Sequence, residues 1–594
     1  MKSTEFYQSN ISKGKKDLKK TKAVLFKFSM LRLSIFLIVI VLAYLFRSNL
    51  PFVGGLVLGG IALFLLFVSR FTDAKQQKRY FEKYIALNEL ELAVESGNLN
   101  ALETGEEFVF ENHHYNQDID LFGAGSLFQM VNRSETKNGK QLLSSWLNSN
   151  DISNIDGKQS TIQEISKKAN WRQDYKIKAS LIESNLSTEP ILEWIKNYEP
   201  FIPNSIKVLP VIFSLFSAAF LGLYFFDYVP GKYLLFWFIL GLGIVGKYVK
   251  KGTDLYNSAS QMQETFGQYS KLIALIETEK FDSEQLQKQQ NKIQTTGLKA
   301  STLLSHFTKR IDSLGQRNNI MLSPVVNGFC LLDIRNLYNV EKWLIENKET
   351  VAQWFEVIEF FDALNSMGNY AFNNEEYIYP KTITDGSFQL DAHKLGHPLL
   401  RKDQLVPNDI TIGQNDFFII TGANMAGKST FLRTVALNIV MANCGLPVSA
   451  SKFDYAPIKL ISSMRTSDSL QNDESYFFSE LKRLKFIVDE IKTDRYFIIL
   501  DEILKGTNSK DKAEGSMQFI QRLAGSTDKA ITCTGIVATH DLSLCTLSDK
   551  LSNVHNHYFD ADIIDDELFF DYTFKKGICQ NMNASFLLKK MEII

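Results

Sequence analysis

Two pairs of long apolar segments interrupt the polar N-terminal half of the chain. Residues 28–46 are apolar apart from Arg32 and a few small polar groups, and residues 51–68 carry no charge. A second pair follows, with an uncharged run at 208–226 and a shorter apolar run at 233–246. The first three are close to the roughly 20 residues that cross the hydrocarbon core of a bilayer, and the fourth is marginal in length. The pattern predicts four transmembrane helices in two hairpins.

Buried core helices are the alternative to membrane spans, but uncharged runs of this length rarely stay soluble. A cleaved signal peptide does not fit, because the basic segment before the first run is too long and a second span follows at once. Lys and Arg flank both hairpins on one side, whereas each turn carries only one of them. The positive-inside rule then predicts a multi-pass protein of the cell (inner) membrane with its soluble domains in the cytoplasm.

Outside these spans, apolar residues recur at spacings of three and four, which predicts helices. The last third differs, because short β-rich apolar runs alternate with helical stretches as in a parallel α/β sheet. We therefore expect a multidomain chain of six segments: a basic cytoplasmic tail (1–27), transmembrane hairpin 1 (28–70), the first part of an all-α core (71–200), transmembrane hairpin 2 (201–250), a further helical segment (251–377), and a C-terminal α/β domain (378–594).

Composition limits the function classes. The 594 residues include 65 Lys and Arg against 66 Asp and Glu, a formal charge of -1, so the whole chain lacks the basic footprint of a dedicated nucleic-acid binder. Any DNA binding must depend on local charge. Five cysteines without a CxxC pair argue against a disulfide framework or a zinc site.

The most specific motif lies between a strand-like run at 417–420 and a helical run at 431–443. It has the pattern G-x-x-x-x-G-K-S, typical of a P-loop. Its glycines let backbone N–H groups face phosphates, Lys428 supplies a positive charge to the β- and γ-phosphates, and the Ser429 hydroxyl can ligate Mg²⁺. The predicted cofactors are ATP and Mg²⁺, and the predicted nucleotide-binding residues here are Gly422, Ala423, Asn424, Met425, Ala426, Gly427, Lys428, Ser429 and Thr430.

Two later runs complete the predicted site. A buried strand at 496–500 ends in two carboxylates, of which Asp501 suits the Mg²⁺ shell together with Ser429. Glu502 is placed to orient or deprotonate the attacking water. A third run ends at His540, whose neutral imidazole would contact the γ-phosphate; a structural strand-end histidine is the alternative. The predicted catalytic residues are Lys428, Glu502 and His540.

Taken in order, these motifs resemble the MutS family of DNA mismatch-repair ATPases. The resemblance covers TGANMAGKSTFLR at the P-loop, the pair Asp501-Glu502, and four further segments: 396–398 (GHP), 406–410 (VPNDI), 505–507 (KGT) and 538–540 (ATH). Residues 475–480 (SYFFSE) look like the family's signature loop, which implies a homodimer in which Ser475 approaches the partner's γ-phosphate. The resemblance also implies that Val406, Pro407 and Asn408 lie near the adenine. It identifies residues 378–594 as an α/β P-loop ATPase domain of ABC type and residues 251–377 as a helical lever and clamp.

The chain also departs from the family pattern. The N-terminal mismatch-reading domain with its Phe-x-Glu wedge has no counterpart, since a membrane hairpin occupies that region. After the acidic pair, Leu504-Lys505 stands where the family usually has Gly-Arg, and Lys512 where Gly is usual. A weaker, collinear resemblance to the family's helical core extends over residues 105–200 and from 251 onward.

We therefore expect a membrane-anchored, dimeric MutS-like ATPase that couples Mg-ATP hydrolysis to binding of double-stranded DNA, mismatched or structured. The alternatives are an ATP-driven membrane scaffold without DNA and, with less support, an ABC-type transporter. A transporter has less support because this chain contains no LSGGQ-like sequence and its spans do not form a plausible translocation path.

Candidate DNA contacts on the lever are Lys292, Lys299, Lys309, Arg310 and Arg317, although a solvated helix face is the better interpretation. For His555 and His557 a surface strand is favoured over a metal site.

Overall fold

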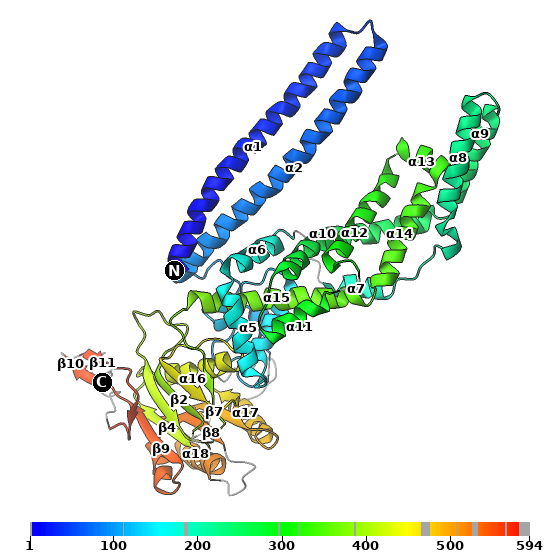
Figure 1. The fold of residues 1–594 in the computed structure, drawn as a ribbon. Helices are drawn as coiled ribbons and strands as arrows, with labels where there is room; N and C mark the ends of the chain where they lie inside the picture. Colours follow the sequence, from blue (N-terminus) through cyan, green and yellow to red (C-terminus); the bar gives the residue numbers. More distant parts are fainter. Residues whose placement is uncertain are drawn as a thin grey trace.

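The computed structural model describes residues 3–110, 112–182, 188–294, 297–319, 321–384, 386, 388–464, 476–505, 508–525, 533–564 and 567–580. Two helical hairpins extend from one side of a helical unit, and a unit of β-sheets and helices lies on its other side (Figure 1). The helix-rich, multidomain architecture with a C-terminal α/β unit is confirmed.

The first hairpin consists of α1 (Ser3–Leu45) and α2 (Leu50–Glu95). Both are long and apolar enough to cross a membrane, with a most apolar window of mean hydropathy 2.4 in each, and none of that window is buried inside the protein. Neither helix breaks at the predicted boundaries near residues 27 and 70. The described part of the basic segment is therefore the polar half of α1 rather than a separate tail.

Polar contacts attach the end of this hairpin opposite its turn to the helical unit. The hydroxyl of Tyr7 in α1 donates to Asn373 Oδ1 at 2.6 Å, and Asn373 Nδ2 donates to Glu91 Oε2 of α2 at 3.0 Å. Glu91 also pairs with Arg133 Nε at 2.7 Å, with both side chains almost fully buried. A buried ion pair of this kind depends on both partners, because either charge alone would be left desolvated.

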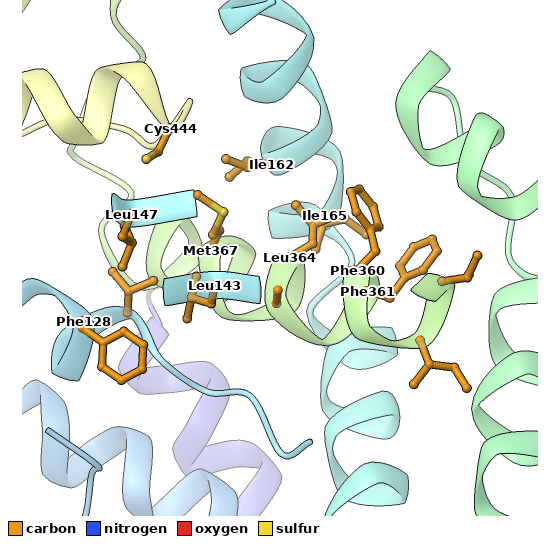
Figure 2. Packing of buried hydrophobic residues seen from close by; sticks show 14 of the residues in the cluster. Phe128, Leu143, Leu147, Ile162, Ile165, Phe360, Phe361, Leu364, Met367 and Cys444 are labelled. Atoms are coloured by element: carbon orange, nitrogen blue, oxygen red, sulfur yellow. The ribbon is translucent and has the colours of Figure 1, made fainter. Parts of the chain in front are cut away.

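The helical unit is built around α15 (Thr350–Asn373), which is buried along most of its length. Figure 2 shows apolar side chains of α15, among them Phe360, Leu364 and Met367, packed near side chains of α4 and α5. The other elements of this unit are η1 (Glu106–Phe108), α3 (Leu127–Val131), α4 (Lys137–Asn148), α5 (Ile155–Lys167), α6 (Ala169–Ser180), α7 (Thr188–Lys196) and α11 (Glu284–Lys292).

The second hairpin is the outer end of a helical arm. It comprises α8 (Leu209–Phe225) and α9 (Gly231–Gly246). The span Asn204–Phe225 passes the same length and hydropathy test, whereas α9 passes only when joined to the next helix across a 55° bend. The described residues thus contain three candidate spans, or four if that bent pair is one. The arm continues with α10 (Val249–Thr278), α12 (Ala300–Gly315), η3 (Gln316–Asn318), α13 (Leu322–Cys330) and α14 (Leu332–Asn347), and η2 (Asn204–Lys207) precedes the hairpin.

The C-terminal unit contains a six-stranded sheet in the order β12-β9-β4-β8-β7-β6, parallel except for β12. Helix α16 (Lys428–Asn443) follows β4 directly, and α17 (Tyr476–Glu490), α18 (Ser509–Ala524) and η4 (Leu542–Asp549) belong to the same unit. A four-stranded sheet, β1-β5-β2-β3, and a two-stranded ribbon, β10-β11, complete it. The strands are β1 (Lys381–Thr382), β2 (Leu390–Leu395), β3 (Asn408–Ile412), β4 (Phe417–Gly422), β5 (Lys452–Tyr455), β6 (Lys459–Ser463), β7 (Tyr496–Asp501), β8 (Thr534–Ala538), β9 (Val554–Phe559), β10 (Asp562–Ile564), β11 (Glu567–Phe569) and β12 (Lys575–Lys576).

One apolar core runs from the helical unit into the four-stranded sheet and α16. At the end of α16, the Lys158 ammonium of α5 donates to the carbonyl of Asn443 at 3.1 Å. Further along α16, Arg433 Nη1 lies 3.0 Å from Asp120 Oδ2. The helix that starts at the P-loop is therefore packed directly on the helical unit.

Replacing Glu91 tests the attachment of the first hairpin. We expect Glu91→Gln to destabilise the folded protein by about 3–5 kcal/mol at neutral pH, because Arg133 stays buried without its carboxylate. Burial raises the pKa of Glu91, but the charge of Arg133 more than offsets this and lowers it to about 2 from 4.5. The ion pair thus stabilises fully above pH 4.5 and is lost as the pH falls towards 2.

The measurement is the unfolding transition of the purified protein in detergent, followed over this pH range. The matched control is Glu89→Gln on the same helix, whose partner Lys15 lies 3.1 Å away and is exposed; an exposed pair contributes at most about 1 kcal/mol. Equal effects of the two substitutions would contradict the anchoring role of Glu91.

Candidate functional site

The predicted site residues meet at the carboxyl ends of three neighbouring parallel strands. Ile420 of β4 pairs with Ala538 of β8, and Ala538 pairs with Asp501 of β7. Ligands of open α/β sheets bind at this edge, because the loops that follow the strands converge there. The register alone therefore brings together the P-loop, the acidic pair and the segment that ends in His540.

The P-loop has the backbone shape that a phosphate cradle requires. Gly427 has φ 100°, and Gly422 has φ 149°. A Cβ at Gly422 would clash with the carbonyl oxygen of Phe559 at the end of β9. Glycine is thus required at both positions, and the loop leads into the N-terminus of α16, where backbone N–H groups and the helix dipole favour an anion.

Lys428 is folded back over this loop. Its ammonium donates to the carbonyl oxygens of Gly422 at 2.8 Å and Ala423 at 2.9 Å, and it lies 3.2 Å from Nε2 of His540. Burial lowers the pKa of Lys428, while Glu502 and Asp501 act in the opposite direction. The ammonium is therefore held by neutral acceptors that a phosphate group can replace.

Ser429 and Asp501 lie in direct contact, as expected for two ligands of one cation. The Ser429 hydroxyl donates to Asp501 Oδ2 at 2.6 Å. Hydroxyl and carboxylate oxygens are ligands that Mg²⁺ prefers, and magnesium sites combine a few such groups with water and phosphate oxygens. The two side chains fit the predicted metal-binding role.

Glu502 is hydrogen-bonded to His540. Its Oε1 lies 2.9 Å from His540 Nε2, the same nitrogen that faces Lys428. This hydrogen bond lowers the pKa of Glu502 to about 2, against the opposing effect of burial. Such a carboxylate is ionised at neutral pH and orients a water well, but it is a weak proton acceptor while His540 holds it.

The turn after the acidic pair is strained and is held by Glu480, a residue that the sequence analysis placed only within the signature segment. Glu502 has φ 49° and Leu504 has φ 59°, values at which a residue other than glycine costs roughly 1–2 kcal/mol. The buried carboxylate of Glu480 accepts hydrogen bonds from the N–H groups of Leu504 at 2.5 Å and Lys505 at 2.9 Å. Helix α17 thereby fixes the turn that positions Glu502.

A second missed residue is Tyr572. Its ring would contact a Cβ at Gly427 at 3.1 Å, and its carbonyl accepts a hydrogen bond from Asn408 Nδ2 at 3.0 Å. Val406, Pro407 and Asn408 thus lie on the same side of the P-loop as this partly exposed ring. No sequence motif marks Tyr572, because its loop and the P-loop are about 145 positions apart along the chain.

Other predicted residues lie elsewhere. Ser475 falls outside the described residues. Three of the five basic lever residues have partners within the arm or the unit: Lys292 pairs with Glu356, Arg310 donates to the carbonyl of Asn339, and Arg317 pairs with Asp333. Lys299 and Lys309 are exposed.

The two histidines of β9 differ in burial, since His555 is exposed and His557 is buried. His557 is buried between the rings of Phe418, at 4.3 Å, and Phe574, at 4.5 Å, so the prediction of a surface strand is wrong for it. Burial lowers its pKa to about 4. Within the described ranges no group of three His, Cys, Asp or Glu side chains has metal-binding geometry.

Comparison with known proteins agrees with this geometry. The family model of MutS domain V matches residues 418–590, which include the P-loop, the acidic pair and His540. Residues 418–590 are therefore similar to the ATPase domain of MutS proteins. The DNA mismatch repair protein MutS of Finegoldia magna is 30% identical over 246 residues, which is 40% of this chain and 28% of that protein. The MutS proteins of Clostridium perfringens and Clostridium botulinum are 29% and 28% identical over 244 and 243 residues, again 40% of this chain and 26% of each protein.

The chain thus matches little more than a quarter of the length of these curated MutS relatives. The resemblance inferred from the motifs is confirmed for the C-terminal part. The weaker resemblance upstream stays a prediction.

Substitution of Glu480 tests its positioning role. We expect Glu480→Gln to lower the rate of ATP hydrolysis about 10-fold or more while nucleotide binding is kept, because the amide oxygen cannot satisfy both N–H groups of the strained turn and Glu502 loses its placement. The measurement is steady-state turnover beside binding of a fluorescent ATP analogue. Asp489→Asn, at an exposed site on the same helix, is the matched control and should leave both unchanged. Normal turnover of Glu480→Gln would exclude the role.

Proposed function

We propose that this MutS-like chain is a membrane-anchored ATPase that binds and hydrolyses Mg-ATP and works as a homodimer on double-stranded DNA. The observation that carries the ATPase is the cluster of Lys428, Ser429, Asp501, Glu502 and His540 at one sheet edge, with the contacts of 2.6 to 3.2 Å described above. Each side chain has the chemistry that phosphoryl transfer needs at its position.

In this proposal the P-loop N–H groups and Lys428 hold the phosphates, and Ser429 with Asp501 holds Mg²⁺, which neutralises charge that develops on the phosphate oxygens. Lys428 exchanges two backbone carbonyls for phosphate oxygens. Once Lys428 and His540 turn towards the phosphates, Glu502 is released, its pKa rises from about 2 towards the usual range, and it becomes a better proton acceptor.

The membrane part of the proposal rests on the two hairpins. Both extend from the helical unit on the side away from the sheets (Figure 1), and both expose large apolar side chains over their outer parts. Covering these surfaces with lipid removes an aggregation hazard that water would leave. The lysines of α1 precede its apolar part, on the side where anionic headgroups would attract them. This polar half of α1 is roughly 35 Å long at 1.5 Å per residue, so it extends from the proposed membrane surface to the helical unit.

DNA binding is proposed from the relatives, which are named as DNA mismatch repair proteins. The homodimer is proposed from the resemblance of residues 475–480 to the signature loop of the MutS family. Because Lys292, Arg310 and Arg317 have partners within the protein, a DNA-binding surface would depend on other basic residues, such as the exposed Lys299 and Lys309.

Two substitutions test the nucleotide site. Lys428→Ala should abolish ATP binding, because the phosphates lose their positive partner. Glu502→Gln should keep binding but slow hydrolysis by about 10²–10⁴-fold, the usual contribution of a general base. Exposed Lys492→Ala is the control for loss of a lysine outside the site. Binding is measured with a fluorescent ATP analogue and turnover by phosphate release; normal turnover in both variants would refute the assignment.

A salt titration tests DNA binding. We expect homoduplex, mismatched or branched DNA to bind to the detergent-solubilised protein with ATP present, and the affinity to fall steeply as salt rises, because phosphate contacts release counterions. Lack of binding to every duplex at low salt would exclude DNA as a ligand and favour the membrane scaffold. ATPase stimulation by a solute enclosed in vesicles, without stimulation by DNA, would favour a transporter.

A further inference from the structure

Helix α13 lies apart from the core of the arm and beside the second hairpin. It packs against α8 and α9, and Figure 1 shows it alongside them rather than in line with α12 and α14. Leu331, which joins α13 to α14, has φ 51°, so the chain turns sharply there. The pattern of charges did not separate this segment from the cytoplasmic arm.

The contact between α13 and the hairpin is close. A Cβ at Gly241 of α9 would clash with the carbonyl oxygen of Gly328 in α13, and one at Gly328 would clash with the ring of Phe238. The rings of Phe238 and Phe329 are 5.3 Å apart. Such glycine-mediated backbone approach is a common way for helices to associate in a membrane, where apolar burial alone does not hold them together.

The free side of α13 is apolar. Met321, Leu322 and Val325 are exposed, and they continue the exposed apolar surface of α8 and α9. Towards the arm the packing is looser, because a cavity of about 360 Å³ lies between α13, η3 and α14, lined by Leu322 and Val326 among others. Helix α13 is therefore held more closely by the hairpin than by the arm.

The positions of these contacts along α8 and α9 show how far α13 extends along the apolar part of the hairpin. Gly241 lies five residues before the end of α9, and Ser214, whose hydroxyl lies 3.5 Å from the carbonyl of Cys330, lies five residues after the start of α8. At 1.5 Å per residue these contacts are roughly 8 Å inside the apolar part of the hairpin. The basic residues Lys247, Lys250 and Lys251 follow α9, at the level where headgroups would begin.

We infer that α13 is a membrane-inserted element: it enters the cytoplasmic leaflet beside the second hairpin, with Met321, Leu322 and Val325 in contact with lipid. This rests on the proposed membrane location of the hairpins. With nine residues α13 is too short to span the bilayer, and it enters and leaves on the same side. The outer end of the arm is then fixed in lipid by three helices rather than two.

The experiment places an environment-sensitive NBD label at single cysteines of the full chain, in a background whose five native cysteines are replaced by Ala and which retains ATP turnover. The positions are Val325→Cys on α13, Leu58→Cys on the apolar part of α2, and Lys309→Cys on the exposed face of α12. Met321→Cys is a second probe of α13. The protein is reconstituted into vesicles of phosphatidylethanolamine and phosphatidylglycerol.

Labels at Val325 and Met321 should show blue-shifted emission, quenching by doxyl-labelled acyl chains and loss of quenching by iodide, as at Leu58. The label at Lys309 should show the opposite. If Leu58 behaves as in lipid but both α13 positions behave like Lys309, the inference is wrong and the membrane anchor stands. If Leu58 is also quenched by iodide alone, the proposed membrane location itself fails.

Discussion

The burial of α15 is the constraint on which the rest of the structure depends. Almost all of this helix is removed from water, so hydrogen bonds from its polar side chains to other parts of the protein stabilise the fold. Asp362 accepts hydrogen bonds from the N–H and hydroxyl of Thr136 and thereby fixes the N-cap residue of α4. Burial raises the pKa of Asp362 to about 6 against the effect of these bonds. Asn373 joins Tyr7 of α1 to Glu91 of α2. One helix therefore determines where the first hairpin and the start of the helical core attach.

The same core connects the helical unit with the nucleotide site. Helix α16 begins at Lys428 and ends against α5, where Lys158 donates to the carbonyl of Asn443. A rigid helix packed at both ends transmits a shift of its N-terminus to its C-terminus, since close-packed interiors do not absorb displacement locally. Any movement of the P-loop on nucleotide binding thus acts directly on α5 and, through it, on α15. The strained turn at Glu502 and Leu504, held by Glu480 of α17, is the other point at which a small displacement would change the site.

Local motifs selected side chains that the structure brings together at one sheet edge, because the P-loop and the strand that ends in Asp501 each carry their candidate chemistry within a few residues. The apolar segments likewise predicted the helices of both hairpins. Local motifs could not predict contacts between segments that are distant in the sequence. Glu480 accepts a hydrogen bond from the N–H of Leu504, 24 positions away, and the ring of Tyr572 lies beside Gly427 of the P-loop. The burial of His557 was missed for the same reason, since its stacking partner Phe574 belongs to a later segment. The basic tail differs because its eight lysines suggest a solvated segment, whereas the spacing of Tyr7, Asn10, Gly14 and Thr21 gives α1 a buried stripe.

An arm that ends in lipid changes what ATP hydrolysis can accomplish. If α8, α9 and α13 lie in the bilayer, the outer end of the arm cannot close freely around a DNA duplex, and any DNA must bind nearer to α10, α12 and the helical unit. The partners of Arg310 and Arg317 within the arm agree with a structural rather than a DNA-binding role for its outer part. With the hairpins in the proposed membrane location, the first hairpin would fix α15 to the bilayer through Glu91 and Tyr7, and the second would fix the far end of the arm. A nucleotide-driven movement of α16 would then act between two hairpins that are both fixed in the bilayer. It would strain the part of the protein between them rather than open a clamp freely.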